Sequence, residues 1–167
     1  MSTLSDDILA YLTLFHAKRD YFECHEVLEH TWQQAPVGER SLSLAALIQI
    51  SVAMYHYRRQ NINGTTKLLT MAKDKIYNNL YEFNALGFDG DATLMFCEHL
   101  LNDVANGVPY KSPQLPLQPT LLDAYTKHCA KLHCSPFVAS DLSDTFLLDK
   151  HIRRFDQDSD TSCVNQD

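Results

Sequence analysis

The sequence predicts an all-α fold, a compact bundle of about five helices followed by a Pro-rich connector and one or two further C-terminal helices. Three observations predict it. Apolar residues before position 107 recur at intervals of three and four, the spacing of one helix face. Gly and Pro, which interrupt helices, are sparse in the same stretch. Alternating runs of β-branched residues, typical of strands, do not occur.

The first three predicted helices cover about residues 5–18, 20–35 and 39–60. The third carries apolar residues nearly all round its surface, which is typical of a helix buried among others. Polar and helix-breaking residues set the boundaries of the first two. The first has three capping residues, Ser5, Asp6 and Asp7, and the second ends at Pro36 and Gly38.

Two more helices complete the predicted bundle. A turn at residues 61–64 precedes the fourth, which runs to about residue 80, and the fifth covers about 91–106. Residues 1–107 are therefore expected to form the self-sufficient helical bundle core. The break between the fourth and fifth helices contains Gly87, Asp89 and Gly90.

The chain changes character at Gly107. Four prolines between residues 108 and 119 exclude a helix there and indicate an extended connector. Helical periodicity returns over about 120–133 and 142–154, so we expect residues 108–155 to be a connector and helical extension that pack over the bundle. Asp, Ser, Gln and Thr then predominate, and residues 156–167 are expected to be a disordered tail.

The composition limits the classes of function. The chain has 167 residues and a formal net charge of −7, and it lacks the excess of Lys and Arg that binds phosphates, so we expect no nucleic-acid partner. No apolar run approaches the ~20 residues that span a bilayer, and the N-terminus does not resemble a signal peptide. The five cysteines form no even framework and no CxxC pair, and an odd count in a chain without a secretion signal indicates reduced thiols. We therefore expect a cytoplasmic protein with no membrane partner.

Chemically useful side chains concentrate on the second predicted helix, in the run YFECHEVLEHTW at residues 21–32. At about 100° per residue, Phe22, His25, Glu26 and Glu29 share one arc, which borders the apolar stripe that contains Trp32. Titratable groups beside a buried stripe are placed to have shifted pKa values or to hold a metal. This helix face is therefore the predicted site.

The third predicted helix supplies the other half of the site. Gln49 and His56, seven residues apart, share a face with small residues that let another helix approach closely. An unpartnered buried amide or imidazole costs about 1–3 kcal/mol, so both need partners. A short connection makes helices two and three antiparallel neighbours, so we expect Glu26 or Glu29, with His25, to point toward Gln49 and His56.

Three interpretations of this His/Glu pocket stay open on the sequence. The residues His25, Glu29 and His56 match the ligand chemistry of a divalent metal such as Zn, Mn or Fe. A metal-free Glu–His pair would instead move a proton or hold a small polar ligand. In the third interpretation the cluster is a buried structural network, and the protein is a non-enzymatic module that binds another protein. The residues do not distinguish an enzyme from a binding protein, or a monomer from a homodimer.

Other candidate residues give weaker signals. We expect His16 and His30 to be half-exposed on their helices. Cys24 lies on the apolar stripe of the second helix, which favours a buried and unreactive thiol. No Gly-rich phosphate loop or nucleophile elbow occurs. A basic patch near the C-terminus is a candidate anion site, formed by Lys150, His151, Arg153 and Arg154.

Two motifs resemble a known family. The run at 21–32, the run ALIQISVAMYHYRRQN at 46–61 and Gly64 are similar, in residues and spacing, to the helical proteins catalogued as domain of unknown function 309. Residues 108–110 and 115–117, with Lys150 and His151, resemble its longer, Bacillus-type members. The resemblance implies an all-α fold in which the His/Glu helix packs on the Gln/His helix, but no reaction, substrate or cofactor. The motif residues that it carries over are Phe22, Glu23, His25, Glu26, Glu29, Trp32, Gln49 and His56.

Overall fold

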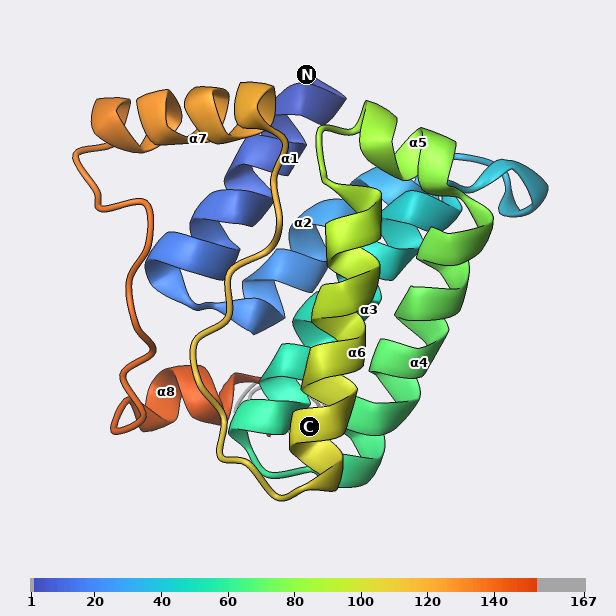
Figure 1. The fold of residues 1–167 in the computed structure, drawn as a ribbon. Coiled ribbons are helices and arrows are strands. Elements are labelled where there is room, and N and C mark those ends of the chain that lie inside the picture. The colour runs from blue at the N-terminus through green and yellow to red at the C-terminus, as the bar shows by residue number, and fades with distance from the viewer. Residues whose placement is uncertain (1, 153–167) are drawn as a thin grey trace, which may run out of the picture.

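Helices make up the regular structure of residues 2–152, the part of the chain that this computed structural model describes, apart from an isolated β-bridge between Phe88 and Leu117 (Figure 1). The predicted all-α class is therefore confirmed. None of the described helices has both the length and the apolar character that crossing a bilayer requires. The expected disordered tail, residues 156–167, and the end of the last predicted helix lie outside the described residues.

The first predicted helix is divided into two segments. α1, Leu4–Leu12, begins one residue earlier than expected, because Thr3 rather than Ser5 is the N-cap and forms a reciprocal capping box with Asp6. After α1 the chain continues as a π-helical segment, Thr13–Lys18. A π-helix has more residues in each turn than an α-helix. Side chains in this segment therefore point in directions that a 3.6-residue wheel does not give.

α2 and α3 are neighbours joined by a short connection, as predicted. α2 covers Tyr21–Gln33 and α3 covers Leu42–Arg58, with a single 3₁₀ turn at Val37–Glu39 between them. Their N-caps, Asp20 and Ser41, each accept a backbone N–H from the first helical turn. The two helices pack against each other, and α3 is buried on nearly all sides, as its apolar sequence predicts.

α4 and α6 complete the bundle beside α3. α4, Ile62–Asn78, begins after the N-cap Asn61 and packs against both α3 and α6. A short helix that the sequence did not predict, α5, covers Leu80–Ala85. α6, Gly90–Ala105, then begins behind the N-cap Asp89. The contacts follow the order α1, α2, α3, α4 and α6, and Figure 1 shows α4 and α6 side by side with α1 on the opposite side of the molecule.

The Pro-rich connector runs back along the bundle. Figure 1 shows it leaving the end of α6 and returning to the opposite end of the molecule, where α7, Pro119–Lys131, lies across α1. Leu115, in the middle of the connector, is buried in the core. The chain then returns to the end of the molecule where α6 finishes. There it forms α8, Thr145–Leu148, with a further helical turn at residues 150–152. The extension therefore packs over the bundle, as expected.

Candidate functional site

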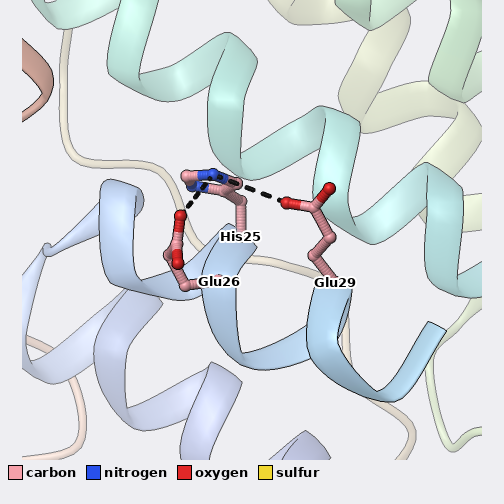
Figure 2. Close-up of side chains that lie close together, drawn as sticks. All are labelled: His25, Glu26 and Glu29. Carbon is pink, nitrogen blue, oxygen red and sulfur yellow. Dashed lines mark ion pairs between the residues drawn. The ribbon is translucent and has the colours of Figure 1, made fainter. Parts of the chain in front are cut away.

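His25, Glu26 and Glu29 form a cluster on the face of α2 that borders α3 (Figure 2). His25 Nε2 lies 3.2 Å from Glu26 Oε1 and 3.8 Å from Glu29 Oε2. One ligand-type atom from each residue lies within 4.8 Å of the other two. The exposed fractions of the side chains are 19% for His25, 38% for Glu26 and 40% for Glu29. The cluster is therefore open to solvent on its carboxylate side.

The apolar stripe of α2 sets the orientation of this cluster. Tyr21, Cys24 and Leu28 are fully buried and fix the rotation of the helix about its axis. The His/Glu arc consequently lies at the edge of the groove between α2 and α3. The ring of Phe22 packs edge-on against the His25 imidazole, with the ring centroids 4.9 Å apart. This contact limits the rotation of the His25 side chain.

The positions of the carboxylates around His25 indicate which ring nitrogen is placed to carry the proton. Nε2 faces two carboxylates, so it is the nitrogen placed to donate. Nδ1 is buried and has no hydrogen-bond partner among the described residues. The other oxygen of Glu29, Oε1, accepts a hydrogen bond from Gln33 Nε2 at 2.9 Å. Glu29 is therefore held with Oε2 directed toward the imidazole.

Two cavities adjoin the cluster, and His25 lines both. The first, of about 190 Å³, lies toward the end of α3 and is lined by aromatic rings and imidazoles. The second, of about 420 Å³, lies toward the start of α3 and contains Glu29, Trp32 and Gln49 from the predicted site. The side chains that line the first cavity with His25 include Phe22, Tyr55, His56 and His151.

The structure does not form the pairing expected between α2 and α3. Gln49 Oε1 is buried and has no hydrogen-bond partner in the described part of the chain. His56 Nδ1 lies 3.0 Å from Nδ2 of Asn61, the N-cap residue of α4, and not beside a carboxylate of α2. The potential metal-ligand cluster in residues 2–152 consists of His25, Glu26 and Glu29, so Glu26 takes the place expected for His56. Gln49 and His56 are seven residues apart on α3, about 10 Å along the helix axis, so they lie at different heights along α2 and line different cavities.

The C-terminal segment contributes residues to the first cavity. Nδ1 of His151 and the hydroxyl of Tyr55 form a hydrogen bond. Burial lowers the pKa of His56, and the nearby His151 and Arg59 lower it further. Burial also lowers the pKa of His151, with Arg59 acting in the same direction. Both imidazoles are therefore neutral at pH 7 and available as ligands or proton acceptors.

The basic residue Lys150 of the expected anion site is already paired with acidic residues of the chain. Lys150 Nζ lies 2.7 Å from Asp20 Oδ2 and 3.0 Å from Glu23 Oε1, and both acids belong to the start of α2. Glu23, which the family motif contains, therefore anchors the C-terminal segment. Arg153 and Arg154 lie outside the described residues.

His16 is not half-exposed, as the sequence suggested, but fully buried. It lies in the π-helical segment, where the 3.6-residue wheel fails. Burial, assisted by the charge of Arg19, lowers the pKa of His16 to about 3. The expectation for Cys24 is confirmed, because its side chain is buried and burial raises the pKa of its thiol. His30 is exposed rather than half-exposed.

Comparison with known proteins identifies the family. A family model described as domain of unknown function (DUF309) matches residues 8–68. The uncharacterized protein YpuF of Bacillus subtilis (strain 168) is 35% identical over 142 residues, which are 84% of this chain and 82% of YpuF. The chain belongs to the DUF309 family. The resemblance drawn from the two motifs is thus confirmed, and no solved structure matches the chain.

The DUF309 match covers the whole cluster together with Gln49 and His56. Lys75 and His151, which line the two cavities, lie beyond it. Nothing in the sequence indicated Lys75, because its position depends on how α4 packs beside α3. His151 was singled out only as part of a basic patch, and its place beside Tyr55 depends on the return of the chain from α7.

Proposed function

We propose that this DUF309 protein binds a divalent metal ion at His25, Glu26 and Glu29 and presents it to a small polar ligand in the adjoining cavities. The observation that carries the proposal is the approach of three ligand-type atoms to within 4.8 Å of one another. Ligands of one ion at about 2.1 Å lie roughly 3.0–3.4 Å apart at octahedral or tetrahedral angles. The His25–Glu26 and His25–Glu29 distances of 3.2 and 3.8 Å are close to this range.

The donor set favours particular metals. One imidazole nitrogen and two carboxylate oxygens suit Zn²⁺, Mn²⁺ or Fe²⁺, whereas softer ions prefer sulfur ligands. Three protein ligands leave at least one coordination position for water or another ligand, as in catalytic rather than structural sites. Since the two carboxylates are 38% and 40% exposed, that position faces solvent.

The environment of His25 predicts a modest affinity. Ligation through Nε2 moves the imidazole proton to Nδ1, which is buried without an acceptor among the described residues. Metal-binding histidines usually donate this N–H to an acceptor, and losing such an acceptor weakens binding about 10–100-fold. We therefore expect an exchangeable ion rather than a permanently bound one.

A metal-free structural role is the second candidate, within a module that binds another protein. The packing of Phe22 on the His25 ring favours it, because that contact stabilises the helix face without an ion. The exposure of Glu26 and Glu29 counts against it, since exposed ion pairs contribute little to stability. The two candidates differ in one measurable respect: only the metal site gains stability from an added ion.

Thermal unfolding with and without divalent ions tests the proposal. Protein purified without chelator should show a raised melting temperature in Zn²⁺, Mn²⁺ or Fe²⁺, since ligand at 100 times its Kd adds about 2.7 kcal/mol. Glu29→Gln should abolish that rise. The matched control Glu98→Gln, which removes an exposed carboxylate on α6, should keep it. An equal rise in both variants, or no rise in the parent protein, would contradict the proposal.

A further inference from the structure

Two buried arginines contact Tyr21. Arg19 is 3% exposed and Arg58 is 7% exposed. Arginine keeps its charge at all pH values that a protein experiences. The Arg58 guanidinium lies over the Tyr21 ring, 4.7 Å from its centroid, and Arg19 Nη1 lies 3.4 Å from the hydroxyl of the same tyrosine. Two positive charges are thus held close together with little access to water.

The hydrogen-bond acceptors of these guanidiniums are neutral groups. Neither arginine forms an ion pair with a carboxylate of residues 2–152, and Arg58 Nε has no hydrogen-bond partner there. Their acceptors are backbone carbonyls and hydroxyls. Arg19 donates to the carbonyls of Pro113 and Val138 and to the Tyr21 hydroxyl, and Arg58 donates to the carbonyls of Arg19 and Leu147 and to Ser140 Oγ.

The nearby acids are already paired with other cations. Asp20 contacts Lys150, and Asp149 contacts Arg59 at 3.3 Å. Burial raises the pKa of Tyr21, so its phenol stays neutral and does not balance the charge. Lys150 is shared between Asp20 and Glu23, so four cations, Arg19, Arg58, Arg59 and Lys150, face three carboxylates. The region therefore has an excess of one positive charge, which an anion would offset.

A cavity of about 420 Å³ adjoins Arg58. Its lining includes Arg58 and the aromatic residues Tyr57 and Tyr110. The longest hydrogen bond of Arg58, from Nη2 to the carbonyl of Leu147, measures 3.4 Å, so this group most readily turns to a stronger acceptor. Ile62, Val108 and Leu142 contribute apolar side chains to the same lining.

We propose that this cavity, between the end of α3 and the start of the connector, binds a small carboxylate whose charged group faces Arg58 and whose apolar body contacts Ile62, Val108 and Leu142. The site is separate from the His25 cluster. It needs no metal, so its test and the metal test succeed or fail independently.

Calorimetric titration with hexanoate and hexanamide tests the inference. The two probes share an apolar body and differ in charge, and inorganic phosphate supplies charge without that body. Hexanoate should bind at least about tenfold more tightly than either, because only hexanoate combines a charged group for Arg58 with an apolar body for Ile62, Val108 and Leu142. Arg58→Met should abolish the preference for hexanoate over hexanamide.

Leu142→Trp is the second variant, because Arg58→Met removes buried contacts and alters folding. Leu142 is 57% exposed, so the larger indole side chain is tolerated at this position. The indole also occupies part of the cavity, which Leu142 lines. This variant should fold normally and bind hexanoate at least about tenfold more weakly. Equal binding of hexanoate and hexanamide, equal binding of hexanoate and phosphate, or unchanged hexanoate binding by Leu142→Trp would overturn the inference.

Discussion

His16 Nε2 accepts a hydrogen bond from the backbone N–H of Leu115, with the two nitrogens 2.9 Å apart. This bond joins the π-helical segment after α1 to the middle of the Pro-rich connector. It needs a neutral imidazole, because a protonated one has no acceptor nitrogen. The pKa of about 3 that burial imposes on His16 keeps the ring neutral in the folded protein.

Acid should therefore weaken the fold through His16. The unfolded chain binds this proton near pH 6.5 and the folded chain only near pH 3, so the stability is present above about pH 6.5 and is lost as pH falls toward 3. The expected loss is about 1.4 kcal/mol per pH unit. Urea unfolding of the parent and His16→Gln between pH 7 and 4.5 measures it. Parallel pH profiles for the two proteins would contradict the prediction, and His30→Gln, at an exposed position, should follow the parent.

Gly87→Ala should destabilise the protein by about 2–4 kcal/mol. The residue has a φ of +95°, and an added Cβ would lie 2.8 Å from Leu121 Cβ on α7, so backbone strain and overpacking combine. Gly107→Ala is the matched control. Its φ is +68° with no atom within 4 Å, so only the backbone cost of about 1–2 kcal/mol applies. Equal losses in urea unfolding would show that α7 does not pack closely on this turn.

Thiol labelling should follow burial. Cys24 and Cys97 are fully buried, and burial raises the pKa of Cys97 to about 12. Half-buried Cys134 should therefore react first with iodoacetamide, because the reactive species is an accessible thiolate. Mass spectrometry of the Cys163→Ser protein at pH 8 measures the order in which the thiols are modified. Modification of Cys24 as fast as Cys134 under native conditions would contradict its assignment as a structural thiol.

Lys150→Met should loosen the C-terminal segment. The Lys150 and Asp20 side chains are 19% and 12% exposed, so their ion pair is worth about 1–2 kcal/mol, between the exposed and buried cases. Backbone amides of α8, measured by hydrogen exchange, should become less protected. Lys127→Met, at a pair that is 71% and 62% exposed, should leave them unchanged. Equal protection in both variants would mean that other contacts hold the segment.

The sequence predicted the helices well where the apolar periodicity is strong. α2 and α3 lie within the predicted ranges 20–35 and 39–60, and the apolar surface of α3 correctly indicated burial. The π-helical segment was not predictable, because its sequence has the same apolar spacing as an α-helix. This one irregularity placed His16 in the core rather than at the surface.

The sequence predicted only part of the candidate site. A helical wheel gives the direction of His25, Glu26 and Glu29 around α2, and the structure brings these three together. It does not give the height of His56 relative to them, which depends on how α2 and α3 slide along each other. Contributions from α4 and the C-terminal segment, such as Lys75 and His151, depend on tertiary packing and carry no local signal.

Calorimetric titration of Zn²⁺ or Mn²⁺ into the chelator-free protein, beside His25→Ala and His30→Ala, is the most direct test of the proposed metal site. His25 supplies the nitrogen ligand of the cluster, whereas His30 is exposed on the same helix and outside it. The parent and His30→Ala should bind one ion per chain, and His25→Ala should bind none at that affinity. Binding by His25→Ala equal to that of the parent, or no binding by any of the three proteins, would contradict the proposal.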